Sequence, residues 1–158
     1  MEKMKKNREF HYTNEQMVKD LIAITPISGS VLDAGSGKNK VWYNNLSGEK
    51  YECEIEDGND FLLWNKEVDW IVGNPPFHCG WKFLDKASTI AKNGIAFLGN
   101  INFWNSCLPN RYEILKKRGF YLTKIHIVQD KRWFGRYYYL IFIKQPNDFV
   151  SWDTKTYK

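Results

Sequence analysis

Residues 31–39 read VLDAGSGKN, a short apolar run that passes directly into a turn containing Gly35 and Gly37. The run predicts a buried β-strand over 30–34, because it is brief, apolar and bounded by turn-forming residues. Glycine has no Cβ, so such a turn lets a ligand approach the backbone closely. The segment therefore predicts an α/β fold with a ligand site directly after its first strand.

The glycine turn lacks the spacing of two common nucleotide-binding loops. Neither GxGxxG nor GxxxxGK[ST] occurs in it, which argues against a dinucleotide site and against a P-loop. An adenosyl group is the ligand that we expect at Gly35 and Gly37.

Strands and helices are predicted to alternate along the rest of the chain. Thr13 and Gln16 have the spacing of a capping box and predict the start of the first helix. This alternation is typical of a doubly wound parallel sheet, and a closing hairpin adds one antiparallel strand. The predicted strands are 30–34, 51–55, 68–73, 95–98, 121–128 and 137–144, and the predicted helices are 14–24, 39–46, 81–92 and 109–118.

The number of residues between two aspartates that flank predicted strands indicates a shortened sheet. Only 35 residues separate Asp33 from Asp69, too few for the two strands and two helices of a full doubly wound half. In seven-strand numbering, we expect the third strand and a helix to be missing or vestigial. The prediction is a mostly parallel sheet of about six strands in the order 2-1-4-5-7-6.

Composition indicates one globular domain with a basic character. The chain has 158 residues, 43% hydrophobic and 26% charged, and no apolar run long enough for a bilayer. We expect a basic arm over 1–9, a catalytic domain over 10–150, a tail over 151–158 and a cytoplasmic location. A net charge of +5 and 16% aromatic residues favour a polyanionic partner such as nucleic acid, and no membrane partner.

Cys53, Cys79 and Cys107 are odd in number, widely spaced and without a CxxC pair. This pattern predicts neither a disulfide framework nor a metal site, so we expect reduced thiols.

Residues 51–61, YECEIEDGNDF, supply acidic groups at the end of the second predicted strand. Glu54 lies about 20 residues beyond the glycine turn, the offset of a carboxylate that accepts ribose hydroxyls. Glu56 is the alternative for that role. Asp60 is suited to bind an adenine amino group, and Phe61 to cover the adenine ring.

Residues 69–77, DWIVGNPPF, end a buried strand in a rigid turn. Pro75 and Pro76 fix φ and remove two backbone donors, so the turn presents oxygen acceptors. If the side-chain oxygen of Asn74 and the carbonyl of Pro75 accept both N–H groups of an aryl amine, its lone pair is directed toward an incoming methyl group. Phe77 offers a face for a base, and the neighbouring His78 is expected to be structural.

The motifs DAGSG, CEIE, NDFL and NPPF, in this order and spacing, resemble those of the amino-methyltransferases, especially the N6-adenine DNA methyltransferases. FHYTN at 10–14 resembles the N-terminal F-x-T-P motif of that family, with Asn14 in place of proline. The resemblance covers roughly 10–144 and implies a Rossmann-like class I fold. It also implies an S-adenosylmethionine site formed by Tyr12, Thr13, Asp33, Gly35, Gly37, Glu54, Asp60 and Phe61, with Asn74, Pro75, Pro76 and Phe77 holding the target amine.

The same resemblance implies methyl transfer to an exocyclic amine, with adenine N6 in DNA as the favoured target. RNA, a protein glutamine and a catalytically silent nucleic-acid-binding subunit remain alternatives. No segment is free to form a separate target-recognition domain, so loops, a partner or an oligomer must supply recognition. Lys131, Arg132 and Arg136, in the loop of the closing hairpin, are the predicted nucleic-acid contacts, although hairpin packing explains this loop equally well. Asn100–Leu108 is the segment expected to line a base pocket.

Overall fold

Six strands form a single sheet in the computed structural model, which describes residues 13–107, 109–132, 135–147, 149–151 and 153–157. Tyr12 and the predicted arm over 1–9 lie outside these residues. The first four strands run parallel, and the last two form the antiparallel hairpin. The strands are β1 (Val31–Asp33), β2 (Lys50–Glu52), β3 (Val68–Gly73), β4 (Ala91–Asn100), β5 (Tyr121–Val128) and β6 (Tyr137–Ile143).

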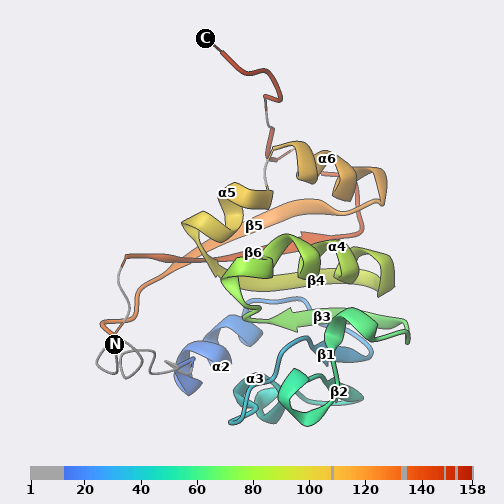
Figure 1. The fold of residues 1–158 in the computed structure, drawn as a ribbon, viewed down its shortest axis with the longest axis vertical. Coiled ribbons are helices and arrows are strands. Elements are labelled where there is room, and N and C mark those ends of the chain that lie inside the picture. Colours follow the sequence, from blue (N-terminus) through green and yellow to red (C-terminus); the bar gives the residue numbers. More distant parts are fainter. Residues whose placement is uncertain (1–12, 108, 133–134, 148, 152, 158) are drawn as a thin grey trace, which may run out of the picture.

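The strand order is β2-β1-β3-β4-β6-β5, which Figure 1 shows from bottom to top. With β3 in place of the fourth strand of a seven-strand sheet, this is the predicted order 2-1-4-5-7-6. The α/β class, the shortened parallel sheet and the antiparallel hairpin are therefore confirmed.

Helices cover both faces of the sheet and divide the core into two clusters. On one face, buried side chains of α4 and α6 pack against β3 and β4, among them Phe83 and Leu115. On the other face, Val18 of α2 and Trp42 of α3 pack against β1 and the opposite side of β3. The helices are α2 (Glu15–Ala23), α3 (Val41–Asn45), α4 (Gly80–Ile90), α5 (Ile101–Cys107) and α6 (Asn110–Lys117).

The connection between β2 and β3 contains only two short 3₁₀ turns, η1 (Ile55–Asp57) and η2 (Phe61–Leu63). The predicted loss of one strand and one helix is confirmed. Phe61 anchors this short connection, because its buried ring packs on Phe83 of α4 with the ring centroids 4.9 Å apart.

Several predicted boundaries need correction. The second strand ends at Glu52 instead of residue 55, since the chain turns into η1 with Glu54 as its cap. The fourth predicted strand, β4, covers Ala91–Asn100 instead of 95–98, because it pairs with β3 and β6 along most of its length. Residues Ile101–Cys107, for which no helix was predicted, form α5.

The predicted cap of the first helix is also wrong by one residue. The side chain of Asn14, not that of Thr13, accepts the hydrogen bond from the Met17 amide, at 3.0 Å. Asn14 therefore caps α2 at the position where the family motif has proline. Gln16 donates to Asp20 along the helix instead of closing a capping box.

Cys53 and Cys107 are buried and Cys79 is half-buried, all three as free thiols. In the described part of the chain, no helix is both long and apolar enough to cross a membrane.

Candidate functional site

A cavity of about 530 Å³ opens at the carboxyl ends of β1, β2 and β3. Its wall comes from the segments that follow these three strands, from Phe83 of α4 and from Thr13 just before α2. Because parallel strands end at the same edge of a sheet, segments distant in sequence converge here. The volume lies within the roughly 300–1,000 Å³ typical of small-molecule sites.

Most of the predicted site residues lie on the wall of this cavity, but not all of them. Asp33 and Pro75 are buried and lie outside the lining, and Phe77 also lies outside it, with 38% of its surface exposed. Tyr12 is not among the described residues. The predicted residues that line the cavity are Thr13, Gly35, Gly37, Glu54, Asp60, Phe61, Asn74 and Pro76.

Glu54 is fastened to the glycine turn. The Gly37 amide donates to Glu54 Oε2 at 2.7 Å, and the Glu56 amide donates to Glu54 Oε1 at 3.2 Å. Gly37 has φ of +66°, a left-handed conformation that favours glycine, and a Cβ there would meet open space. Two backbone amides therefore orient a carboxylate that keeps further lone pairs for a ligand.

Glu56, the alternative to Glu54, does not line the cavity. Its side chain is exposed and lies 4.0 Å from the Lys38 ammonium. Of the two acidic residues, Glu54 is the one that the structure brings to the cavity wall.

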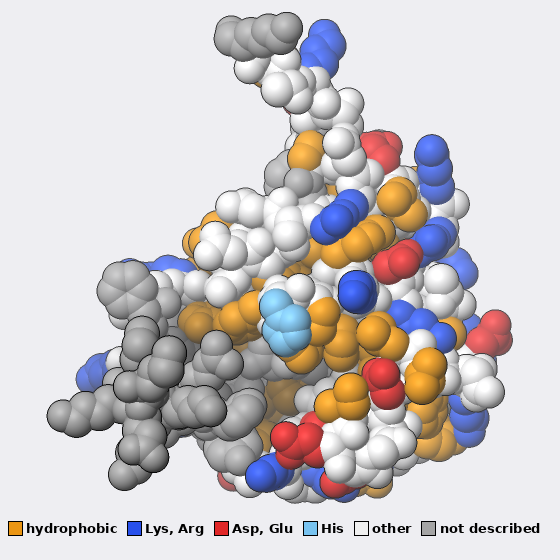
Figure 2. Space-filling view, in the orientation of Figure 1, with side chains coloured by type: hydrophobic (Ala, Val, Ile, Leu, Met, Phe, Trp, Pro, Cys, Tyr) orange, Lys and Arg blue, Asp and Glu red, His pale blue; other side chains and the backbone are white. Residues whose placement is uncertain are grey.

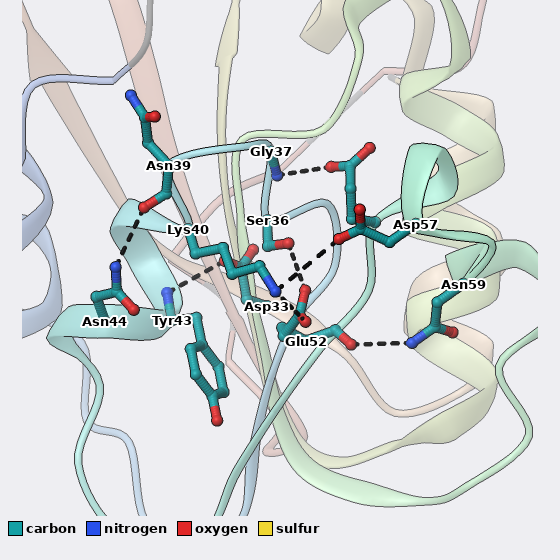
Figure 3. Close-up of polar contacts among 11 residues, drawn as sticks. Asp33, Ser36, Gly37, Asn39, Lys40, Tyr43, Asn44, Glu52, Asp57 and Asn59 are labelled. Carbon is teal, nitrogen blue, oxygen red and sulfur yellow. Dashed lines mark hydrogen bonds and ion pairs between the residues drawn. The ribbon is translucent and has the colours of Figure 1, made fainter.

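Asp33 lies directly behind the glycine turn and is fully buried. Its Oδ2 accepts a hydrogen bond from the Tyr43 amide at 3.2 Å (Figure 3), whereas its Oδ1 has no hydrogen-bond partner within the described residues. Gly73, with φ of +142°, makes room for this carboxyl group, because a Cβ there would lie 3.1 Å from Oδ1. Burial, followed by the charges of Glu52 and Glu54, raises the pKa of Asp33 to about 7 against the opposing amide hydrogen bonds.

Asn74 connects the turn after β3 to the segment before α2. Its Nδ2 donates to the Thr13 hydroxyl at 3.2 Å, while its buried Oδ1 has no hydrogen-bond partner in the part of the chain that the structure describes. A buried carbonyl oxygen without a partner carries a desolvation penalty that a bound donor would remove. Asn74 is thus held in place through one end of its amide and lacks a partner at the other.

The NPPF turn also carries an aromatic pair. The ring of Phe77 packs on that of Tyr137 at the start of β6, with centroids 5.7 Å apart and planes tilted by 42°. Tyr137 is largely buried, so the exposed ring of Phe77 packs on a fixed neighbour. The sequence had singled out Phe77 but not its support, since the two residues are 60 positions apart.

Other cavity residues were missed by the sequence analysis. Ile55 is 67% exposed although apolar, and Trp42 enters the wall from α3. The position of Ile55 directly after Glu54 was a usable signal, whereas nothing near Trp42 in the sequence marked it. Residues 100–108, the expected lining of a base pocket, contribute none of the lining of this cavity among the described residues.

His78 and Cys79 both line the cavity beside Pro76. The Cys79 thiol lies 3.7 Å from the Pro76 carbonyl oxygen, and burial raises its pKa. The thiol is therefore mostly protonated at neutral pH, a poor state for a nucleophile.

The predicted nucleic-acid contacts lie near the end of β5, next to α2. Lys131, Arg132 and Arg136 are exposed, and Lys131 and Arg132 border a groove that also includes Asn14. Arg132 is bonded to Asp130, with Nη2 and Oδ2 2.7 Å apart. Part of the positive charge predicted for this loop is thus neutralised within the loop.

Solved structures share this architecture. Magnesium protoporphyrin IX methyltransferase from Synechocystis PCC 6803, with bound S-adenosylhomocysteine, superimposes with a TM-score of 0.59 at 12% identity, over 82% of each chain. A ribosomal protein L11 methylase from Lactobacillus delbrueckii subsp. bulgaricus gives 0.60 at 11% identity, over 84% of this chain and 78% of that one. This chain has the class I methyltransferase fold.

Another structure with the class I methyltransferase fold is a Pyrococcus horikoshii protein proposed to be an RNA methyltransferase. It gives a TM-score of 0.55 at 20% identity, over 85% of this chain and 81% of that one. No protein-family model and no curated protein sequence matches the chain. The enzymes that share the fold act on different substrates, so the fold by itself selects none of them.

Asp33 should make the stability of the protein depend on pH. Its pKa is about 7 in the folded protein and ordinarily 3.8, so between these values the folded state keeps a proton that the unfolded state has released. The stability that Asp33 contributes is fully present below about pH 4. As the pH rises from about 4 through about 7, the free energy of unfolding falls by at most about 4 kcal/mol. Urea unfolding of wild type and Asp33→Asn should show the gap between them change over this range, whereas parallel pH profiles would contradict the prediction.

Proposed function

We propose that this protein is an S-adenosylmethionine-dependent methyltransferase that methylates the exocyclic amine of adenine in DNA. The observation that carries the proposal is Asn74, whose buried Oδ1 has no hydrogen-bond partner among the described residues although Asn74 lines the same cavity as Gly37 and Glu54. A polar acceptor beside a site suited to an adenosyl group is the arrangement that amine methylation needs.

The donor and acceptor set of the cavity suits the adenosyl cofactor. The Glu54 carboxylate, oriented by two amides, fits the ribose hydroxyls, and Asp60 fits the adenine amino group. Asp60 is itself oriented, because its Oδ1 accepts the Leu62 amide at 2.9 Å. Ile55 and Phe61, which also line the cavity, supply apolar surface for the flat adenine ring.

When bound, S-adenosylmethionine supplies an electrophilic methyl group. In our proposal, Asn74 Oδ1 accepts one N–H bond of the target amine. The Pro75 carbonyl, next to Asn74 in the chain although Pro75 lies outside the cavity lining, accepts the other. The two acceptors hold the lone pair of the amine toward the methyl group and later stabilise the positive charge that develops on nitrogen. The fixed Asn74–Thr13 contact keeps the Asn74 amide in one orientation. Most of the acceleration then comes from proximity and alignment, so no nucleophilic side chain is needed.

The choice of a base as substrate is supported by the Phe77–Tyr137 pair. A partly exposed ring packed on a fixed neighbour offers a stacking face beside Asn74, which an extrahelical adenine can use. The net charge of +5 also favours a nucleic acid, and the choice of DNA over RNA rests on the resemblance to the N6-adenine DNA methyltransferases. On the face drawn in Figure 2, however, basic side chains are interspersed with acidic ones. We therefore assign phosphate binding to particular residues, such as Lys131 and Arg136.

The ribose role of Glu54 predicts a selective loss of cofactor affinity. Glu54→Ala should weaken binding of S-adenosylhomocysteine, measured by calorimetry, by about 10-fold or more, because hydrogen bonds to a charged group are lost. Glu56→Ala is the matched control, since its side chain lies outside the cavity lining, and its affinity should equal that of wild type. Equal losses in both variants would contradict the assignment.

Asn74→Ala should reduce methyl transfer on the order of 100-fold or more while the affinity for S-adenosylhomocysteine stays within a few-fold, because an acceptor of the reacting amine is removed. Transfer is measured with labelled cofactor on single-stranded DNA, duplex DNA, RNA and protein, with mass spectrometry of the product. Asn93→Ala is the control and should be fully active, because Asn93 lies near the start of β4, whereas the cavity lies at the carboxyl ends of the parallel strands.

The same assay decides among substrates. N6-methyladenine in DNA is the expected product, with single-stranded or frayed sites preferred because base extrusion costs least there. N6-methyladenine in RNA or methylglutamine in protein would replace DNA as the substrate. Absence of transfer by a wild-type protein that binds the cofactor, with all four substrates, would favour a catalytically silent subunit.

DNA binding should depend unequally on the three predicted cations. Replacing Lys131 and Arg136 by Gln should weaken binding and lower the slope of log affinity against log salt by about one per lost phosphate contact. Arg132→Gln should have a smaller effect, because its guanidinium is already bonded to Asp130. Fluorescence anisotropy at several salt concentrations measures both quantities, and unchanged slopes in all variants would assign this loop to hairpin packing.

A further inference from the structure

Lys40 has an unusual backbone for a residue beside a binding site. Its φ is +48°, and among the described residues it is the one non-glycine with positive φ. It ends the glycine turn and directly precedes α3. A left-handed conformation is unfavourable for a residue with a Cβ, so surrounding contacts must maintain it.

Glu52, the last residue of β2, makes those contacts. Its Oε1 accepts a hydrogen bond from the Lys40 ammonium at 2.8 Å, and its Oε2 accepts one from the Ser36 hydroxyl at 2.5 Å. Figure 3 shows this carboxylate between the two ends of the turn. One side chain thus joins both ends of residues 36–40 to the edge of the sheet, where Glu52 is paired in register with Asp33.

The Lys40–Glu52 contact has the character of a charged pair that persists at neutral pH. Burial acts to raise the pKa of Glu52, but the hydrogen bonds from Lys40 and Ser36 together outweigh it and lower the pKa. The hydrogen bond to Glu52 raises the pKa of Lys40. Asp57, 3.9 Å from the Lys40 ammonium, adds a second negative charge on the same side.

The two glutamates near the end of β2 divide the turn between them. Glu54 takes the Gly37 amide on the cavity side, and Glu52 takes the side chains of Ser36 and Lys40. Only Glu54 lines the cavity. Glu52 is therefore in a position to fix the shape of the turn without touching what the turn binds.

We propose that Glu52 is a positioning residue for the cofactor site, an inference that rests on the proposed function. By holding Ser36 and Lys40 at once, it keeps residues 36–40 in the conformation that receives the adenosyl cofactor. The side chain acts through the turn, so its removal loosens the turn before it affects the core of the sheet.

The first test needs no ligand. In Glu52→Gln, and separately in Lys40→Met, amide hydrogen exchange of a peptide spanning residues 35–40 should be about 10-fold faster than in wild type, while exchange in β3 stays unchanged. Glu56→Gln is the matched control, because it removes only the exposed pair with Lys38 at 4.0 Å. Exchange of the turn in Glu52→Gln at the rate of wild type overturns the proposal.

The second test measures S-adenosylhomocysteine by calorimetry. Glu52→Gln should weaken binding about 10-fold, and the Glu52→Gln/Lys40→Met double variant should bind little worse than either single variant, because both changes remove one shared interaction. Lys40→Arg, which keeps the charge, should restore most of the affinity lost in Lys40→Met. If Glu52→Gln exchanges faster but binds S-adenosylhomocysteine as tightly as wild type, the positioning role is overturned. If Glu52→Gln exchanges faster and wild type binds no cofactor, the role of Glu52 in holding the turn is supported and the proposed function is refuted.

Discussion

Parallel pairing of β1 with β2 on one side and β3 on the other is the constraint on which the site depends. In this register Asp33 is opposite Glu52 in β2 and Val72 in β3. The chain therefore leaves all three strands at one edge, and the glycine turn, the acidic segment and the NPPF turn emerge together. All three residues of β1 are buried, so this pairing has a hydrophobic core on both sides to maintain it.

The short connection between β2 and β3 changes how the wall of the cavity is built. A full fold of this kind has a further strand and helix there, whereas this chain has only η1 and η2. Local hydrogen bonds replace the missing elements, since Glu54 and Asp60 each bind a backbone amide two residues ahead. Phe61 then fastens the segment to α4 through Phe83. A small protein can keep an ordered acidic loop in this way.

Three carboxylates lie close behind the glycine turn, and their surroundings differ. Asp33 is fully buried, with one oxygen that no described residue hydrogen-bonds, and burial raises its pKa. Glu52 is bonded to an ammonium and a hydroxyl, so its pKa is lowered despite partial burial. Glu54 faces the cavity and is oriented by amides. Three carboxyl groups thus behave differently because their solvation and partners differ. Asp33 is a buried acid, Glu52 is a charged group that holds the turn, and Glu54 is a hydrogen-bond acceptor at the cavity.

The sequence by itself determined the class of fold, the strand order and the edge of the sheet at which the cavity opens, because strand and helix periodicity, turn residues and connection length are local properties of the chain. It also predicted roles for Glu54 and Asn74, which stand at fixed offsets from the ends of strands, and the structure places both on the wall of one cavity. The roles of Glu52 and Tyr137, the choice of Asn14 as the cap and the exclusion of Asp33 from the cavity wall were decided only by the tertiary structure. Each of these features depends on contacts that strand pairing or helix packing creates. The residues adjacent in sequence determine neither the distance between the contacting residues nor their burial.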